Sequence, residues 1–274
     1  GQLTGSYDPE PAATAKNVVV VGAGPAGLEA ARVAAERGHS VTLYEKKGSV
    51  GGLLEFANNV KGPHENLSVL RSYFERQMEV LGVNVMLNTE ATADIIAEAS
   101  PDIVIAATGG VRDTLGLSDT AGTKVVGIDD FMMADIAEEV VIVGSNVQAI
   151  DAAMYLLAQG KHVQVVTPNA ASAIGAGHSF WVKTFTQPNM KALGVRFWPE
   201  ATVTAVNDGS VTVKTATGIE QEIACGTVVE ALDCLPNDSL STGLSCEVVT
   251  VGDAARPFNI GEAICSGNAA ARAI

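Results

Sequence analysis

The sequence is short of cationic side chains and has no long apolar run. Its 274 residues include 17 Lys and Arg against 31 Asp and Glu, which gives a formal net charge of −14. This charge argues against nucleic acid or an anionic membrane surface as a partner. No apolar stretch is long enough to span a bilayer, and no secretory leader pattern is visible. We therefore expect a cytoplasmic protein with neither nucleic-acid nor membrane partners.

The sequence also lacks the paired cysteines of redox and metal centres. Its four cysteines form no C-x-x-C pair, which argues against a redox-active disulfide and against an iron–sulfur cluster within this chain. The four histidines lie far apart and show no metal-ligand spacing. We predict no metal site and assign no catalytic acid or base. The cysteines are Cys225, Cys234, Cys246 and Cys265.

What the sequence does contain is a glycine-rich turn between a predicted strand and a predicted helix. Residues 18–21 are four valines, which predict a buried strand, and a helix-forming run occupies 28–36. The glycines between them follow G-x-G-x-x-G: the first allows a tight turn, the second lets a pyrophosphate approach the backbone, and the third lets helix and strand pack closely. We predict dinucleotide phosphates at this helix start; the alternative is the same unit without a ligand. The predicted contacts are Gly22, Gly24, Pro25, Ala26 and Gly27.

A second predicted strand, 41–45, ends in an acid. Glu45 lies 18 residues past Gly27, where a carboxylate can accept hydrogen bonds from the adenosine ribose. Residues 47–53 form a second glycine-rich loop that gives the backbone room beside a dinucleotide, or else a plain turn. A helix expected at 64–81 carries an arginine that either reaches a ligand phosphate or stays solvated. The candidate contacts of this region are Lys46, Gly52, Leu53 and Arg71, with Ala91 at the start of a helix expected over 91–99.

Two further strand ends complete the candidate site. A buried strand at 102–106 runs into Ala107, Thr108 and Gly109, whose small size lets a loop cross close to a nucleotide, although ordinary sheet packing also tolerates them. A strand at 248–253 ends in Gly252-Asp253, where the carboxylate accepts bonds from a ribityl chain or caps a turn. A helix beginning near Asn259 or Ile260 would direct its dipole at a flavin ring, so Ile260 is a candidate contact.

The opening unit is repeated later in the chain. Residues 139–167 again predict strand, turn, helix and strand, displaced by 122 positions if Gly144 is set against Gly22. The repeat is degraded, because Asn146 replaces the second glycine and no acid ends its second strand. We predict a second nucleotide domain whose site either takes NAD(P)H as a possible second nucleotide or is weak or empty. Its candidate contacts are Gly144, Ser145 and Asn146.

The rest of the second half predicts mixed structure. Residues 170–190 predict a loop with a possible short helix, because of their glycines and Pro188. Residues 195–198, 202–206 and 211–215 alternate as strands that would cover one face of the second domain, with a hairpin turn at 207–210. Residues 226–232 predict another buried strand.

These motifs together resemble the two-dinucleotide-domain flavoproteins, and in particular the C-terminal half of the fused NADH:flavin oxidoreductases, which include 2,4-dienoyl-CoA reductase, enoate reductases and trimethylamine dehydrogenase. The likeness rests on residues 22–27 with Glu45, on 107–109, on the second unit and on 251–260. It implies an α/β protein with two Rossmann-like dinucleotide-binding domains, the second inserted in the first, as in glutathione reductase. The expected boundaries are a linker or arm at 1–16, an FAD (ADP) domain at 17–113 and 247–274, and an NAD(P)-like domain at 114–246.

The resemblance also implies cofactors and a partner. In the reductases, electrons pass from NAD(P)H to FAD in the first domain and then to FMN in a barrel domain that this chain lacks. The chain would be an excised half or a stand-alone electron-entry subunit. Its expected partner is an FMN-containing barrel domain or subunit, and a homo-oligomer is compatible with the resemblance. In the amine dehydrogenase branch ADP replaces FAD and the second domain binds no NAD. The alternative is therefore a non-catalytic ADP- or FAD-binding structural module.

Overall fold

The computed structural model describes residues 9–62, 65–237, 239–240 and 244–274. The chain forms two compact units. The first unit comprises Gly1–Val111 and Cys234–Ile274, and the second comprises Arg112–Asp233. The second unit is thus inserted into the sequence of the first. Short strands β5 (Val111–Arg112) and β14 (Cys234–Leu235) stand where the chain passes between the units.

The first unit is built on a parallel five-stranded sheet with the strand order β15-β4-β1-β2-β3. Strand β1 lies at its centre, and its valines are buried on both faces, as expected for a strand that is covered on both sides. The bounds are β1 Asn17–Val21, β2 Ser40–Tyr44, β3 Asn84–Met86, β4 Ile103–Ala106 and β15 Glu247–Thr250.

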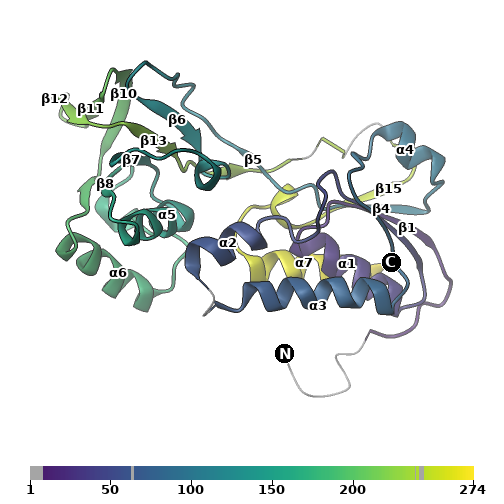
Figure 1. Ribbon diagram of the computed structural model, residues 1–274. Coiled ribbons are helices and arrows are strands. Elements are labelled where there is room, and N and C mark those ends of the chain that lie inside the picture. The colour runs from purple at the N-terminus through teal and green to yellow at the C-terminus, as the bar shows by residue number, and fades with distance from the viewer. Residues whose placement is uncertain (1–8, 63–64, 238, 241–243) are drawn as a thin grey trace. The chain divides into compact units, whose positions relative to one another are not determined.

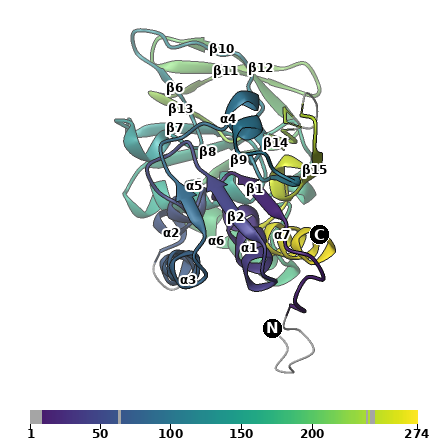
Figure 2. The same cartoon turned by 90° about the vertical axis from the view of Figure 1, so that its right-hand side faces the viewer.

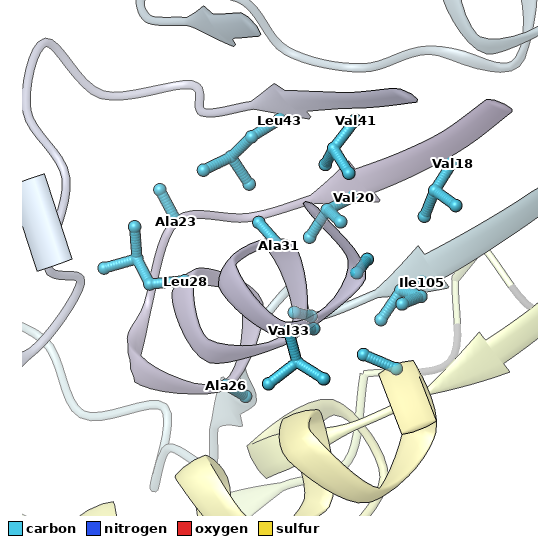
Figure 3. Packing of buried hydrophobic residues seen from close by; sticks show 14 of the residues in the cluster. Val18, Val20, Ala23, Ala26, Leu28, Ala31, Val33, Val41, Leu43 and Ile105 are labelled. Atoms are coloured by element: carbon cyan, nitrogen blue, oxygen red, sulfur yellow. The ribbon is translucent and has the colours of Figure 1, made fainter. Parts of the chain in front are cut away.

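Helices cover both faces of this sheet. On one face, Val18 and Val20 share a hydrophobic cluster with Leu28 and Phe74, and helices α1, α3 and α7 lie side by side there (Figure 1). Figure 3 shows side chains of α1 directed at those of β1, β2 and β4. On the other face, Val19 packs with Ile96 of α4. The helices are α1 Pro25–Glu36, α2 Leu54–Lys61, α3 Leu67–Val80, α4 Ala93–Glu98, 3-10 helix η5 Gly252–Ala254 and α7 Ile260–Ala273.

The second unit has the same kind of parallel sheet, in the order β6-β13-β7-β8-β9. A separate antiparallel sheet, β10-β11-β12, accompanies it (Figure 2). The strands are β6 Lys124–Gly127, β7 Glu139–Val143, β8 His162–Val166, β9 Arg196–Trp198, β10 Ala201–Asn207, β11 Ser210–Thr215, β12 Glu220–Ala224 and β13 Thr227–Glu230. The helices are η3 Phe131–Met133, α5 Val147–Ala158, η4 Ala171–Ala173 and α6 Phe180–Ala192.

The predicted α/β class with parallel, Rossmann-like sheets is confirmed, and several local predictions are corrected. Helix α6 is longer than the possible short helix predicted within 170–190, because Pro188 stands inside it rather than ending it. Strand β9 extends the parallel sheet instead of joining an antiparallel face. The helix expected from 64 begins at Leu67, and residue 64 lies outside the described residues. Helix α2 and strand β12 were not predicted. None of the helices in the described part of the chain combines the length and apolar character needed to cross a bilayer.

Candidate functional site

The first glycine turn is held by close backbone packing at two of its three glycines. Gly22 has φ +101°, and a Cβ there would overlap the Ala107 carbonyl oxygen. A Cβ on Gly27 would overlap the Gly22 carbonyl oxygen. These two glycines therefore let the end of β1, the start of α1 and the end of β4 approach one another, as the sequence predicts.

The middle glycine has a different reason to be there. Gly24 has φ −75° and ψ 178°, which any residue adopts, and a Cβ there would meet no heavy atom of the described residues within 4 Å. Neither conformation nor protein packing requires a glycine at this position. The bare backbone instead leaves open space next to the start of α1.

Among the described residues, the start of α1 has neither a side-chain cap nor a nearby acid in its own first turn. Pro25 stands at its beginning. The positive end of the helix dipole and the N–H groups of Ala26 and Gly27 therefore face the space beside Gly24. An anionic group such as a pyrophosphate fits this arrangement.

Glu45 lies at the end of β2 with only 7% of its surface exposed. Its Oε2 accepts a hydrogen bond from the Ala23 backbone N–H (2.8 Å), and its Oε1 accepts one from the Lys47 N–H (2.8 Å). Two backbone donors thus fix the carboxylate beside the glycine turn. Each oxygen keeps a further lone pair, so the group fits the predicted role of accepting ribose hydroxyls.

The second glycine-rich loop adjoins the first turn. The Gly51 N–H donates to the Ala23 carbonyl (2.7 Å), and a Cβ on Gly52 would lie 3.0 Å from the Gly24 Cα. Arg71 packs over this loop, with its Cδ 3.2 Å from where a Cβ on Gly51 would lie. The structure therefore brings Gly52 and Arg71 to the turn.

Arg71 forms ion pairs with Glu55 (3.2 Å) and Glu75 (3.0 Å), and 27% of its side chain is exposed. The guanidinium therefore has two carboxylate partners, both exposed at the surface. Lys46 is exposed, and Leu53 stands half-buried at the start of α2.

The end of β4 supplies small residues beside the turn. Ala107 donates its N–H to the Val21 carbonyl (2.8 Å) and is buried, whereas Gly109, with φ +74°, faces open space at its missing Cβ. The Thr108 hydroxyl donates to the Asn237 carbonyl (3.3 Å). The Ala91 side chain belongs to the hydrophobic cluster on the α4 side of the sheet, so it packs in the core.

The residues predicted to meet a flavin are occupied by local contacts. Asp253 Oδ1 accepts a hydrogen bond from the Phe258 N–H (3.3 Å), as a turn-capping residue does. Ile260 begins α7, but Asn259 caps this helix by accepting from the Glu262 N–H (2.9 Å). A Cβ on Gly252 would lie 2.7 Å from the Ala26 Cβ, so this glycine keeps η5 against the start of α1.

The second glycine turn is filled by its own side chains. Asn146 takes φ −74° and ψ −179°, almost the angles of Gly24, and its Oδ1 accepts from the Ala149 N–H (3.0 Å). Its Nδ2 lies 3.1 to 3.2 Å from the carbonyls of Ala231 and Leu232 and from Asp233 Oδ1. The amide therefore occupies the helix start that the first turn leaves open.

The other predicted contacts of the second turn are also occupied. Ser145 is buried, and its hydroxyl accepts from Asn169 Nδ2 (2.9 Å). Gly144 packs against the Ala231 carbonyl as Gly22 does against that of Ala107. Asn169, Ala176 and Asp233 shape this turn but were not among the predicted site residues. Asp233 stands three residues past the end of β13, as Gly109 does past the end of β4, so an alignment of the two halves of the chain places them at corresponding positions.

Comparison with known proteins identifies the family. The family model for pyridine nucleotide-disulphide oxidoreductases matches residues 16–253. The chain belongs to this family. An NADH oxidase of Thermoanaerobacter brockii is 39% identical over 157 residues, covering 55% of this chain and 24% of the relative. A bilirubin reductase of Mediterraneibacter gnavus is 32% identical over 227 residues, covering 81% of this chain and 34% of the relative.

A solved structure extends the match to nearly the whole chain. A 2-naphthoyl-CoA reductase complex is similar with a TM-score of 0.87 and 33% identity over 98% of this chain and 41% of that chain. The resemblance to the fused flavin reductases, and membership of an oxidoreductase family, are therefore confirmed. The chain spans about a quarter to two fifths of the length of these three proteins.

Proposed function

We propose that the first unit binds FAD through its adenosine diphosphate half and that the chain is the flavin-binding part of an oxidoreductase. The observation that carries this proposal is the bare backbone at Gly24. A glycine that neither its dihedral angles nor its neighbours require, next to an uncapped helix start, is explained by a diphosphate that must come close.

The residues have distinct roles in this proposal. The N–H groups at the start of α1 bind the diphosphate, and Glu45, already oriented by two backbone donors, binds the adenosine ribose. Gly52 and Gly109 leave room for the extended ligand, and Arg71 orients the Gly51-Gly52 loop. The bound flavin would supply hydride and electron transfer, while the protein supplies position and electrostatics.

A barrel domain or subunit carrying FMN is the proposed electron partner. The support is that this chain covers 41% of the 2-naphthoyl-CoA reductase chain and 24% of the NADH oxidase. The remaining length of such relatives has room for a further domain.

One observation favours ADP as a second candidate ligand. The features suited to the adenosine diphosphate half are open, whereas Asp253 and the start of α7, which were expected to meet the flavin half, already hold local hydrogen bonds. In that case the chain is a structural nucleotide-binding module.

The test is to purify the chain and identify what it carries. Absorbance near 450 nm, FAD in the supernatant after denaturation and bleaching by dithionite without air would support the flavin proposal. Colourless protein that releases ADP would support the structural module instead. Protein that carries neither nucleotide and takes up neither FAD nor ADP in calorimetric titration would overturn both.

A further inference from the structure

The two glycine turns share one backbone framework. In each turn the first glycine donates its N–H to the end of the neighbouring strand, at 2.8 and 2.9 Å. In each, the x residue of G-x-G accepts from a glycine in a later loop, at 2.7 and 2.6 Å. These matched pairs are Gly22→Tyr44 and Gly144→Val166, and Gly51→Ala23 and Gly175→Ser145.

The shared framework makes corresponding positions comparable. Three glycines around the first turn correspond to residues with side chains around the second. Each pair is defined by its place: the N-cap of the helix, the residue after the loop glycine, and the third residue past the strand end. The pairs are Gly24 and Asn146, Gly52 and Ala176, and Gly109 and Asp233.

These three replacements converge on one place. Ala176 forms a β-bridge with Asn146, and the Asn146 amide bonds the Asp233 carboxylate (3.2 Å). Asn146 Oδ1 accepts from the Ala149 N–H, which corresponds to the Gly27 N–H that a phosphate would take in the first unit. Asp233 adds a negative charge where a diphosphate would have to enter, which opposes anion binding.

We propose that Asn146 and Asp233 form a latch that excludes nicotinamide dinucleotides from the second unit. They are specificity-determining residues: the amide takes the place of a phosphate oxygen at the helix start, and the carboxylate repels the ligand. In this proposal the second unit has a structural role and binds no nucleotide. This inference does not depend on which nucleotide the first unit binds.

The experiment maps NADH and NADPH binding by amide hydrogen exchange on the whole chain. At 5 mM ligand, the wild-type protein is expected to show no added protection in residues 144–158. The double variant Asn146→Gly/Asp233→Gly opens the turn and is expected to bind NADH at least 10-fold more tightly, with new protection in that segment. Asp233→Gly alone keeps the helix cap and should give a smaller gain.

Controls separate this result from loss of folding and from the first unit. The Thr92 hydroxyl caps α4 by accepting from the Ile95 N–H. Thr92→Gly removes this cap without opening a glycine turn, so the variant should gain no NADH binding. Circular dichroism checks the fold, and FAD uptake reports the first unit separately. Wild-type protection of residues 144–158 by NADH would overturn the latch. An intact double variant that still binds no dinucleotide would overturn the assignment to these two residues.

Discussion

The two glycine turns have nearly identical backbones and opposite surfaces. Gly24 and Asn146 differ by a degree in φ, yet one leaves the helix start bare and the other caps it with an amide. The comparison shows that the middle glycine of G-x-G-x-x-G is a matter of space rather than of backbone conformation. Under our proposals, a few side chains on a shared backbone framework decide which turn binds a nucleotide.

The comparison also concerns stability. In the second unit the Ala149 N–H is satisfied by Asn146, so the helix start needs no ligand. In the first unit no side chain among the described residues caps the helix start, and the nucleotide that we propose there would stabilise the folded state by an amount that grows with the logarithm of its concentration over Kd. The first unit should therefore gain more from added nucleotide than the second.

The largest expected effect comes from the third position of the motif. Gly27→Ala places a methyl group on the Gly22 carbonyl oxygen and 3.1 Å from the Ala107 Cβ, which we expect to cost about 3 kcal/mol of unfolding free energy. The reverse change in the second unit, Ala149→Gly, should cost only about 1 kcal/mol, from helix propensity. Urea unfolding measures both. Equal costs would contradict the close contact between Gly27 and the Gly22 carbonyl oxygen.

The next effect is on binding and would make the first turn resemble the second. Gly24→Asn keeps the backbone angles that Asn146 already adopts, so the fold should persist. The new amide should cap α1 and weaken FAD binding about 100-fold, or about 2.8 kcal/mol. Fluorescence titration of the apoprotein with FAD measures the loss. Gly24→Ala, whose methyl group meets no described protein atom, should lose less. Full FAD affinity in Gly24→Asn would contradict the proposed site.

The smallest expected effect is on the pH dependence of stability, and it contrasts two histidines. His39 directly precedes β2 in the first unit, and His162 begins β8 in the second. His39 is buried, its Nδ1 accepts from the Lys16 N–H (3.1 Å), and its Nε2 has no partner among the described residues. Burial, with Arg37 and Lys16 nearby, lowers the pKa of His39. His162 is exposed beside Glu139, whose hydrogen bond raises the pKa of His162.

The two shifts have opposite consequences for stability. The lowered pKa means that folding favours neutral His39, so its contribution to stability is complete above the ordinary pKa of 6.5 and declines as the pH falls below 6.5 towards the lowered pKa. The contribution of His162 is complete below 6.5 and is lost as the pH rises through the raised pKa. His39→Asn, which keeps an acceptor for the Lys16 N–H, should reduce the loss of stability on acidification. Unfolding free energies from pH 5 to 8 measure it, and an unchanged profile would contradict this account.

Much of the fold follows from local sequence pattern. The valine runs that form β1 and β7 are buried on both faces, so their strands were predictable from composition alone. The full length of helix α6 was not predictable from the sequence. Pro188 predicts a break in the helix, but the helix continues past it to Ala192, where the buried Met190 packs in the core. Strand β9 was misassigned because a three-residue strand does not reveal whether its neighbour runs parallel or antiparallel.

The candidate site was predictable only for residues whose spacing along the chain forms a known binding motif. The positions of the first turn and Glu45 follow from one motif, but the anchoring of the Glu45 carboxylate by the Ala23 and Lys47 N–H groups does not. The contact between Asn146 and Asp233 joins residues 87 positions apart, which no local pattern reports. Ala91 shows the opposite case: its sequence position is close to candidate residues, but its side chain packs in the core.

The first unit is discontinuous, and this has a consequence for biosynthesis. A Cβ on Gly267 of α7 would overlap the Ala26 carbonyl oxygen, so the terminal helix packs on the first turn of α1. Strand β15, also from the last segment, completes the sheet beside β4. A nascent chain therefore emerges with its first Rossmann half unfinished until the inserted half has been translated. The sheet and the helix packing around Gly24 are therefore complete only after β15 and α7 have been translated, and the proposed nucleotide binding should follow that step.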